Sequence, residues 1–300
     1  MCFKPNDSHR IFLTILAWMV ILVISDLPNI LWDTFFGLTP DWLLWGKAGF
    51  LALFLATCLA WKNLQPLWQF ACVMFLFYLA LGLNTWVGNT TWWQIRFVGE
   101  QTSFARGYLE LHVRDLGVAF VVIGVLWLVK RRREAFYLTK GKLDARIEPV
   151  RWLGIREGES WSAFGLIFAF AAGLLILVVV ILAAPPSWEM VMRAIPLLPI
   201  AVLLAALNAF SEEIYYRASL FSTLQETIGR KQTQFINVVF FGLAHVLVGS
   251  PPGVIGFLLT GFLAWLMGKS ILETKGLFWA WFIHFVPDVV IFASYALWWA

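Results

Sequence analysis

The stretch WSAFGLIFAFAAGLLILVVVILAA, residues 161–184, decides the fold, and Pro185 and Pro186 follow it directly. About 20 mostly apolar residues in a helix cross a hydrocarbon core about 30 Å thick. This stretch is long enough and carries no ionisable side chain. It therefore predicts a membrane-spanning helix that stops at the two prolines, because proline has no backbone N–H to donate.

The composition of the whole chain agrees with a membrane protein. Hydrophobic residues make up 61% of the 300 residues and charged residues 13%, against roughly 45–50% and about 25% in soluble domains. A water-soluble fold cannot bury so much apolar surface. The composition therefore excludes a disordered chain, a disulfide-stapled secreted module and a cytosolic globular enzyme. The net charge of +4 is small, and we expect no nucleic-acid partner.

Eight further stretches are candidates for spanning helices. In chain order the candidates are residues 11–31, 43–61, 66–87, 116–130, 161–184, 191–210, 234–249, 253–272 and 277–298. The fourth and the seventh are short. We therefore expect an all-α polytopic membrane helix bundle with eight or nine transmembrane helices.

The basic residues predict how the chain is oriented, because cytoplasmic loops are enriched in Lys and Arg. Such residues are dense between Lys130 and Arg156. Residues 131–160 are therefore expected to form a basic cytoplasmic loop between a four-span region, residues 1–130, and a C-terminal membrane region, residues 161–300. Counting spans from this loop places the N-terminus inside, and we expect a multi-pass protein of a bacterial inner membrane. No role follows for residues 1–130.

Ionisable side chains on three apolar segments mark a candidate site, because each costs about 2.5 to 3.5 kcal/mol on insertion scales. The residues are Glu212, Glu213 and Arg217, then Phe241 and His245, then His284 and Asp288. Glu213 and Arg217 are four residues apart on one helix face, so we expect Arg217 to hold Glu213. Glu212 then points about 100° away and is free to act as an acid or base.

Each of these residues also has a structural explanation. A single membrane histidine can be a hydrogen-bonded core residue, and two glutamates at a helix end can reach the interface. Their joint occurrence on three segments favours a site. His9 and His112 lie in polar flanks, and no role is expected for them.

The ordered motifs are Glu-Glu-x-x-x-Arg at 212–217, Phe-x-x-x-His at 241–245 and His-x-x-x-Asp at 284–288. Together they resemble the CPBP intramembrane proteases, the family of CAAX prenyl endopeptidases and of bacteriocin-processing or abortive-infection proteins. The resemblance covers about residues 196–298. It implies an endopeptidase whose site lies within the membrane and opens to the cytoplasm, acting on a membrane-associated or lipid-modified polypeptide.

The resemblance also implies roles for the motif residues. Glu212 and His245 would activate water, and His284 would stabilise the oxyanion of the tetrahedral intermediate. The supporting residues would be Glu213, Arg217 and Phe241. Asp288 stands where the family has Asn or Asp. An ionised Asp288 would repel an oxyanion, so it must be protonated, orient His284 or bind a cation.

The cofactor stays open at this point. Glu212, His245 and His284 could hold a zinc ion with water as the fourth ligand, or a glutamate could act without metal. Two other functions also fit. A proton-coupled transporter would use the same buried groups as a relay, and a non-catalytic bacteriocin-immunity or scaffold protein would bind a partner through its Trp-rich spans. Substrate identity and oligomeric state do not follow from the sequence.

Overall fold

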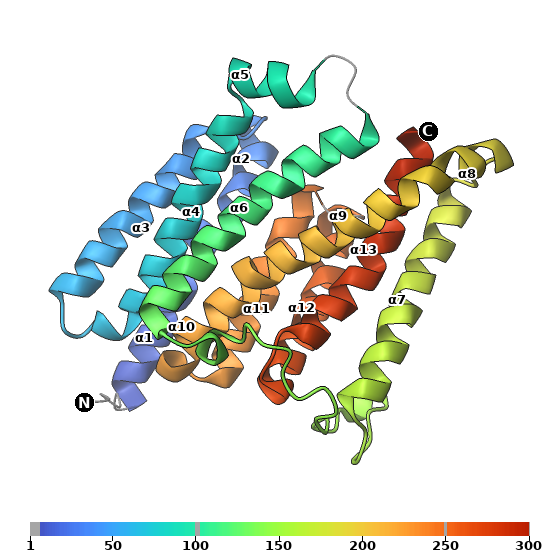
Figure 1. Ribbon diagram of the computed structural model, residues 1–300. Helices are drawn as coiled ribbons and strands as arrows, with labels where there is room; N and C mark the ends of the chain where they lie inside the picture. Colours follow the sequence, from blue (N-terminus) through green and yellow to red (C-terminus); the bar gives the residue numbers. More distant parts are fainter. Residues whose placement is uncertain (1–6, 100–102, 249–250, 300) are drawn as a thin grey trace. The chain divides into compact units, whose positions relative to one another are not determined.

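A computed structural model describes residues 7–99, 103–248 and 251–299 of the chain (Figure 1). Within these residues the regular structure is helical, and β-pairing is limited to two isolated bridges, Arg146 with Ser160 and Val150 with Ile155. Eight helices of the described part are long and apolar enough to cross a membrane. The expected all-α polytopic membrane bundle is therefore confirmed.

Most of the predicted spans are present with shifted ends. The eight are Asp7–Ile24, Trp42–Ala60, Gln65–Gly88, Phe104–Lys130, Trp161–Ala183, Trp188–Ile228, Gly253–Thr274 and Phe278–Trp299. The fourth is much longer than the predicted stretch 116–130, because its first turns carry polar side chains that pair: Arg114 Nε lies 3.0 Å from Glu110 Oε1. Residues 234–248 of the predicted seventh stretch lie in a helix, Arg230–Val248, that is too polar to count among the eight, and residue 249 lies outside the described residues.

The helices form two compact units, each built from both halves of the chain. Unit 1 comprises Met1–Gly82, Val121–Leu138 and Ile214–Lys269, and unit 2 comprises Leu83–Phe120, Thr139–Glu213 and Ser270–Ala300.

Unit 1 is organised around helices α1, α10 and α11. The unit contains α1 (Asp7–Ile24), α2 (Leu27–Phe36), α3 (Trp42–Ala60), the first part of α4 (Trp68–Gly88), the second part of α6 (Phe104–Lys130), α10 (Ser219–Ile228), α11 (Arg230–Val248) and most of α12 (Gly253–Thr274). Helix α1 packs on α10 and α11. The buried amide of Asn237 on α11 donates to the carbonyl of Ala264 on α12 at 2.9 Å. The polar residues of α11 are therefore used within the bundle.

A buried lysine in unit 1 is neutralised by its neighbours. Lys47 of α3 is 5% exposed. Its Nζ lies 2.6 Å from Asn29 Oδ1 and 3.6 Å from Asp26 Oδ1. Burying an unpaired charge is costly, and pairing together with hydrogen bonding offsets that cost. Asp26 and Lys47 fall within the first two predicted spans, 11–31 and 43–61, and their charges thus stabilise each other.

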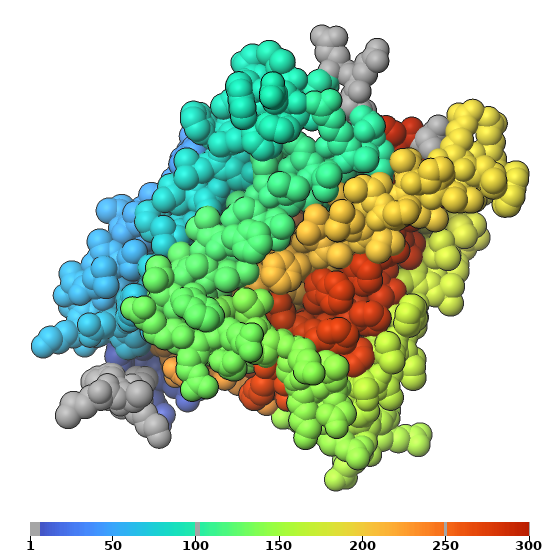
Figure 2. Space-filling model, in the orientation of Figure 1, coloured from blue at the N-terminus to red at the C-terminus, as the bar shows by residue number. Residues whose placement is uncertain are grey.

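Unit 2 is built on helix α13 (Phe278–Trp299), which packs on α7 (Trp161–Ala183) and α9 (Leu198–Glu212). Gly165 of α7 allows close approach, since a Cβ there would lie 2.4 Å from the Trp279 ring. Small residues have this role in many membrane interfaces. An apolar core joins α9, α13 and the start of α6 around Phe104, Leu204 and Phe292. Figure 2 shows the first half of α6, in green, beside α9, in gold.

Candidate active site

The two glutamates lie where one long helical run changes its geometry. The run Trp188–Ile228 contains α8 (Trp188–Ala194), a 3-10 turn, α9, the π-helical segment η6 (Glu213–Ala218) and α10. Glu212 ends α9 and Glu213 begins η6. π-helical turns are rare and occur frequently at functional sites. The change in helix geometry therefore coincides with the Glu-Glu motif, and both indicate the same candidate site.

Helix α13 contributes the second part of the site. His284 and Asp288 are one turn apart and nearly buried, each 7% exposed. Pro287 lies between them inside the helix. Because proline lacks an N–H, the carbonyl one turn earlier loses its usual helical partner.

The imidazole of His284 is surrounded by three carboxylates of unit 2. Its Nδ1 lies 3.0 Å from Glu213 Oε1. Its Nε2 lies 3.6 Å from Glu212 Oε2 and 3.6 Å from Asp288 Oδ2. A carboxylate can only accept, so Nδ1 donates to Glu213 and the ring orientation is fixed. Nε2 is thereby directed at Glu212 and Asp288.

The two glutamates differ in their access to the surroundings. Glu213 is completely buried, whereas the side chain of Glu212 is 21% exposed. Glu213 can therefore orient the imidazole but cannot reach a substrate. Glu212 has both a histidine neighbour and an open side.

Asn208 is a member of the cluster that the sequence interpretation missed. It lies on α9 one turn before Glu212, and its Nδ2 donates to Asp288 Oδ2 at 3.0 Å. This bond and the 3.6 Å distance to His284 favour the alternative in which Asp288 orients His284. An amide within an apolar helix, four residues before a candidate base, is the signal that could have identified it.

The remaining motif residues form a stack in unit 1. The guanidinium carbon of the buried Arg217 lies 4.0 Å from the centroid of the Phe241 ring. The ring of His245 lies 4.4 Å from that of Phe241, and His245 Nδ1 bonds to the carbonyl of Phe241 at 2.9 Å. Phe241 and His245, which are four residues apart, therefore lie on one face of α11. The pairing of Arg217 with Glu213, and the joining of His245 to Glu212 and His284, stay predictions, because these residues belong to different units.

The N-terminal half also supplies buried polar groups to unit 2. His112 of α6 is 5% exposed, and the centroid of its ring lies 5.0 Å from the centroid of the Phe292 ring on α13. Asp115 accepts a hydrogen bond from Asn84 at 2.9 Å. The expectation that His112 is a polar flank residue is wrong, because α6 begins earlier than predicted and buries it.

No group of three or more His, Cys, Asp or Glu side chains in the described ranges is arranged to hold a metal ion. Within unit 2, His284 Nδ1 is already engaged by Glu213. Zinc binding by Glu212, His245 and His284 therefore stays a prediction.

Residues 193–290 match the family described as Rce1-like, type II CAAX prenyl endopeptidase Rce1-like. No curated protein and no solved structure matches the chain. The matched residues include the two glutamates, His245, His284 and Asp288, in the order that resembles the CPBP proteases. Residues 193–290 of this multi-pass membrane protein, about a third of the chain, are therefore similar to the type II CAAX prenyl endopeptidases, in agreement with the resemblance of the motifs to the CPBP intramembrane proteases.

Proposed function

We propose that the protein hydrolyses a peptide bond of a membrane-associated or lipid-modified polypeptide, and that Glu212 is the general base. The observation that carries this proposal is the placement of Glu212. It is partly exposed and lies 3.6 Å from Nε2 of a histidine whose other nitrogen is bound by the buried Glu213.

The chemistry needs three things: a water made nucleophilic, a stabilised oxyanion and a proton for the leaving amine. Glu212 takes a proton from water and returns it to the amine, so that one carboxylate serves as base and then as acid. In this step His284 is an imidazolium with a proton on each ring nitrogen, so Nε2 donates to the oxyanion while Nδ1 stays bonded to Glu213. His245 assists Glu212 at the water, an assignment that rests on its motif.

Asp288 and Glu213 are positioning residues in this proposal. Glu213 is completely buried and donates nothing to the substrate, so its contribution is the direction of the imidazole. Asp288, held by Asn208 at 3.0 Å, steadies the other edge of the ring. A preorganised histidine loses little energy to reorientation when charge develops on the substrate.

The test compares cells that express the wild-type protein with cells that express Glu212→Gln. The readout is the set of polypeptide termini in their membranes. We expect one or a few termini to depend on Glu212, with the variant expressed and inserted at the wild-type level. Glu226→Gln is the matched control, because Glu226 lies on the same helical run and is exposed.

The other functions predict different outcomes. Unchanged termini in Glu212→Gln cells would refute the assigned mechanism. Ion flux in proteoliposomes that Glu212→Gln loses, without any peptide product, would establish a transporter instead. Full activity in a His245→Ala variant would contradict the role of His245. Metal analysis of the purified protein, with activity measured before and after chelation, decides the zinc question.

A further inference from the structure

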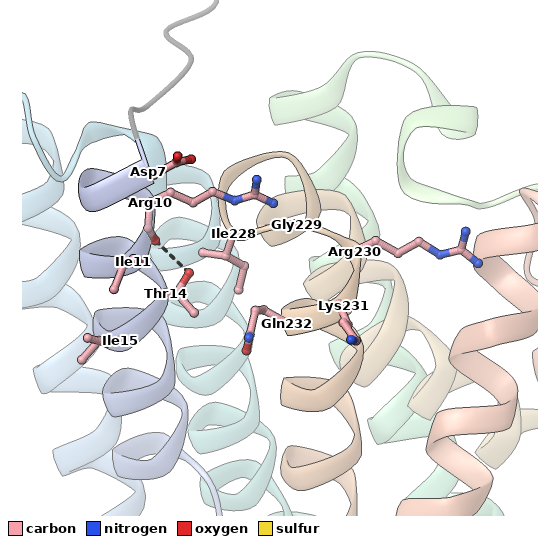
Figure 3. A pocket seen from close by; sticks show the side chains of 10 residues that line it. All are labelled: Asp7, Arg10, Ile11, Thr14, Ile15, Ile228, Gly229, Arg230, Lys231 and Gln232. Atoms are coloured by element: carbon pink, nitrogen blue, oxygen red, sulfur yellow. Dashed lines mark hydrogen bonds between the residues drawn. The ribbon is translucent and has the colours of Figure 1, made fainter.

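A cavity at one end of unit 1 is not used by the proposed protease site. It has a volume of about 490 Å³ and lies between the first turns of α1 and the junction of α10 with α11 (Figure 3). Its lining is Asp7, Arg10, Ile11, Thr14, Ile15, Ile228, Gly229, Arg230, Lys231 and Gln232. Three of these side chains are basic and one is acidic, so the cavity favours an anion.

Arg10 is the basic residue that extends across the cavity. Figure 3 shows its side chain reaching from α1 towards the α10–α11 junction. Gly229 makes room for it: a Cβ at this position would lie 2.0 Å from Arg10 Nη2. Gly229 also has φ +92, a backbone conformation that favours glycine. Within the described residues the guanidinium of Arg10 forms no hydrogen bond or ion pair with another side chain, and it is exposed.

The rest of the cavity is apolar and continues onto the face of a membrane-spanning helix. Ile11 and Ile15 of α1 are 61% and 56% exposed, while Ile228 is almost completely buried. One turn apart, the two exposed isoleucines form an apolar strip that leads away from Arg10. Below them, Trp18 Nε1 donates to Gln232 Oε1 at 3.0 Å and ties α1 to α11. The cavity therefore combines a cationic end with an apolar strip, and a hydrogen bond between α1 and α11 holds these two helices together.

We propose that this cavity binds an anionic phospholipid, with its phosphate at Arg10 and Lys231 and an acyl chain along Ile11 and Ile15. A free anion would use the cationic end but has nothing to place on the apolar strip. Basic pockets between membrane helices bind lipid headgroups by this combination. The predicted cytoplasmic position of the N-terminus places the cavity in the leaflet that carries anionic lipids.

The experiment is native mass spectrometry of the full chain in detergent, titrated with phosphatidylglycerol or with phosphatidylcholine of the same acyl chains. We expect one phosphatidylglycerol to be retained more tightly than phosphatidylcholine. Arg10→Gln and Lys231→Gln should each weaken it about fivefold, which corresponds to about 1 kcal/mol for a Lys or Arg near a membrane surface. Arg156→Gln, in the segment after α6, removes an exposed positive charge outside the cavity and should leave binding unchanged.

A second variant tests the geometry without changing the charge. Gly229→Ala should weaken phosphatidylglycerol binding, because the added methyl displaces the Arg10 guanidinium. Equal retention of the two lipids, or unchanged binding in the Arg10→Gln, Lys231→Gln double variant, would overturn the proposal. If millimolar inorganic phosphate alone displaces the bound phosphatidylglycerol, the cavity is a site for a free anion and the lipid proposal is wrong. These readouts do not depend on peptidase activity, so they stand apart from the test of Glu212.

Discussion

Replacing Glu213 by glutamine tests whether the buried carboxylate acts through His284. The change keeps the volume of a completely buried side chain and removes its charge. The bond that it alters joins His284 Nδ1 and Glu213 Oε1 at 3.0 Å. A hydrogen bond to a charged group is worth about 1.5–3 kcal/mol. If that energy orients the imidazole in the transition state, kcat falls about 10- to 150-fold, at 1.36 kcal/mol for each factor of ten.

The Michaelis constant should not follow kcat in this variant. Because Glu213 has no exposed surface, it cannot contact the substrate. The assay measures both constants on a peptide that spans the cleavage site found by comparing membrane termini. Glu273→Gln is the matched control in the same unit: its Oε2 accepts a bond from Trp161 Nε1 at 2.8 Å, and an amide oxygen can accept the same bond. The control should keep wild-type kcat.

A double-mutant cycle separates positioning from stability. If Glu213 acts through His284, then Glu213→Gln should cost almost nothing further in a His284→Gln background. Additive losses in the two variants would refute the reasoning. So would a Glu213→Gln enzyme with wild-type kcat, or one in which only the Michaelis constant changes.

Three further predictions concern stability, measured by thermal unfolding in detergent. Asp26→Asn should destabilise the protein by about 1–3 kcal/mol, because the 5% exposed Lys47 loses its ion pair. Lys47→Met should be close to neutral, and an equal loss of stability in the two variants would contradict this. Gly165→Ala should cost about 1–3 kcal/mol by overpacking, since its Cβ would lie 2.4 Å from an indole ring, while Gly124→Ala, with nothing within 4 Å, should be neutral or stabilising. Burial raises the pKa of Tyr137, whose hydroxyl donates to a glutamine at 2.9 Å. Its contribution to the stability of the fold is therefore complete below its ordinary pKa, about 10, and is lost as the pH rises through the pKa of the folded state. Tyr137→Phe should remove this loss of stability at alkaline pH, and an unchanged pH profile of stability would contradict the assignment.

The accuracy of the predicted spans follows from what each helix buries. The predicted stretch 161–184 agrees with α7, because that helix is apolar throughout and prolines follow it. The start of α6 was missed, since Glu110 and Arg114 pair with each other and allow a polar turn to continue the helix. Polarity alone does not report such pairing. The same limit applies to α11, where buried Asn237 bonds to another helix.

The candidate site was predictable in its residue types but not in its connections. Intramembrane charge alone identified His284, Glu212 and Asp288 as candidates. The sequence interpretation paired Glu213 with Arg217, because a spacing of four residues was the only contact that it could supply. The 3.0 Å contact of Glu213 with His284 comes from another helix, 71 residues further along the chain. Asn208 was missed for the same reason, since its partner Asp288 is equally remote in sequence.

Helices α9 and α13 pack through an apolar part and a polar part, and we infer that the apolar part provides stability and the polar part the chemistry. One part of the pair is apolar, with Leu204, Ala205 and Phe292 in a shared core. The other part holds His284 with its carboxylates, and every such group costs energy in a membrane. Since the apolar part already fixes the spacing of the helices, the polar part is not needed to hold them together. His284→Asn should therefore be inactive and yet unfold close to the wild-type temperature, because its amide can still donate to the completely buried Glu213. If the cluster were needed to hold the helices together, this variant would unfold at a lower temperature.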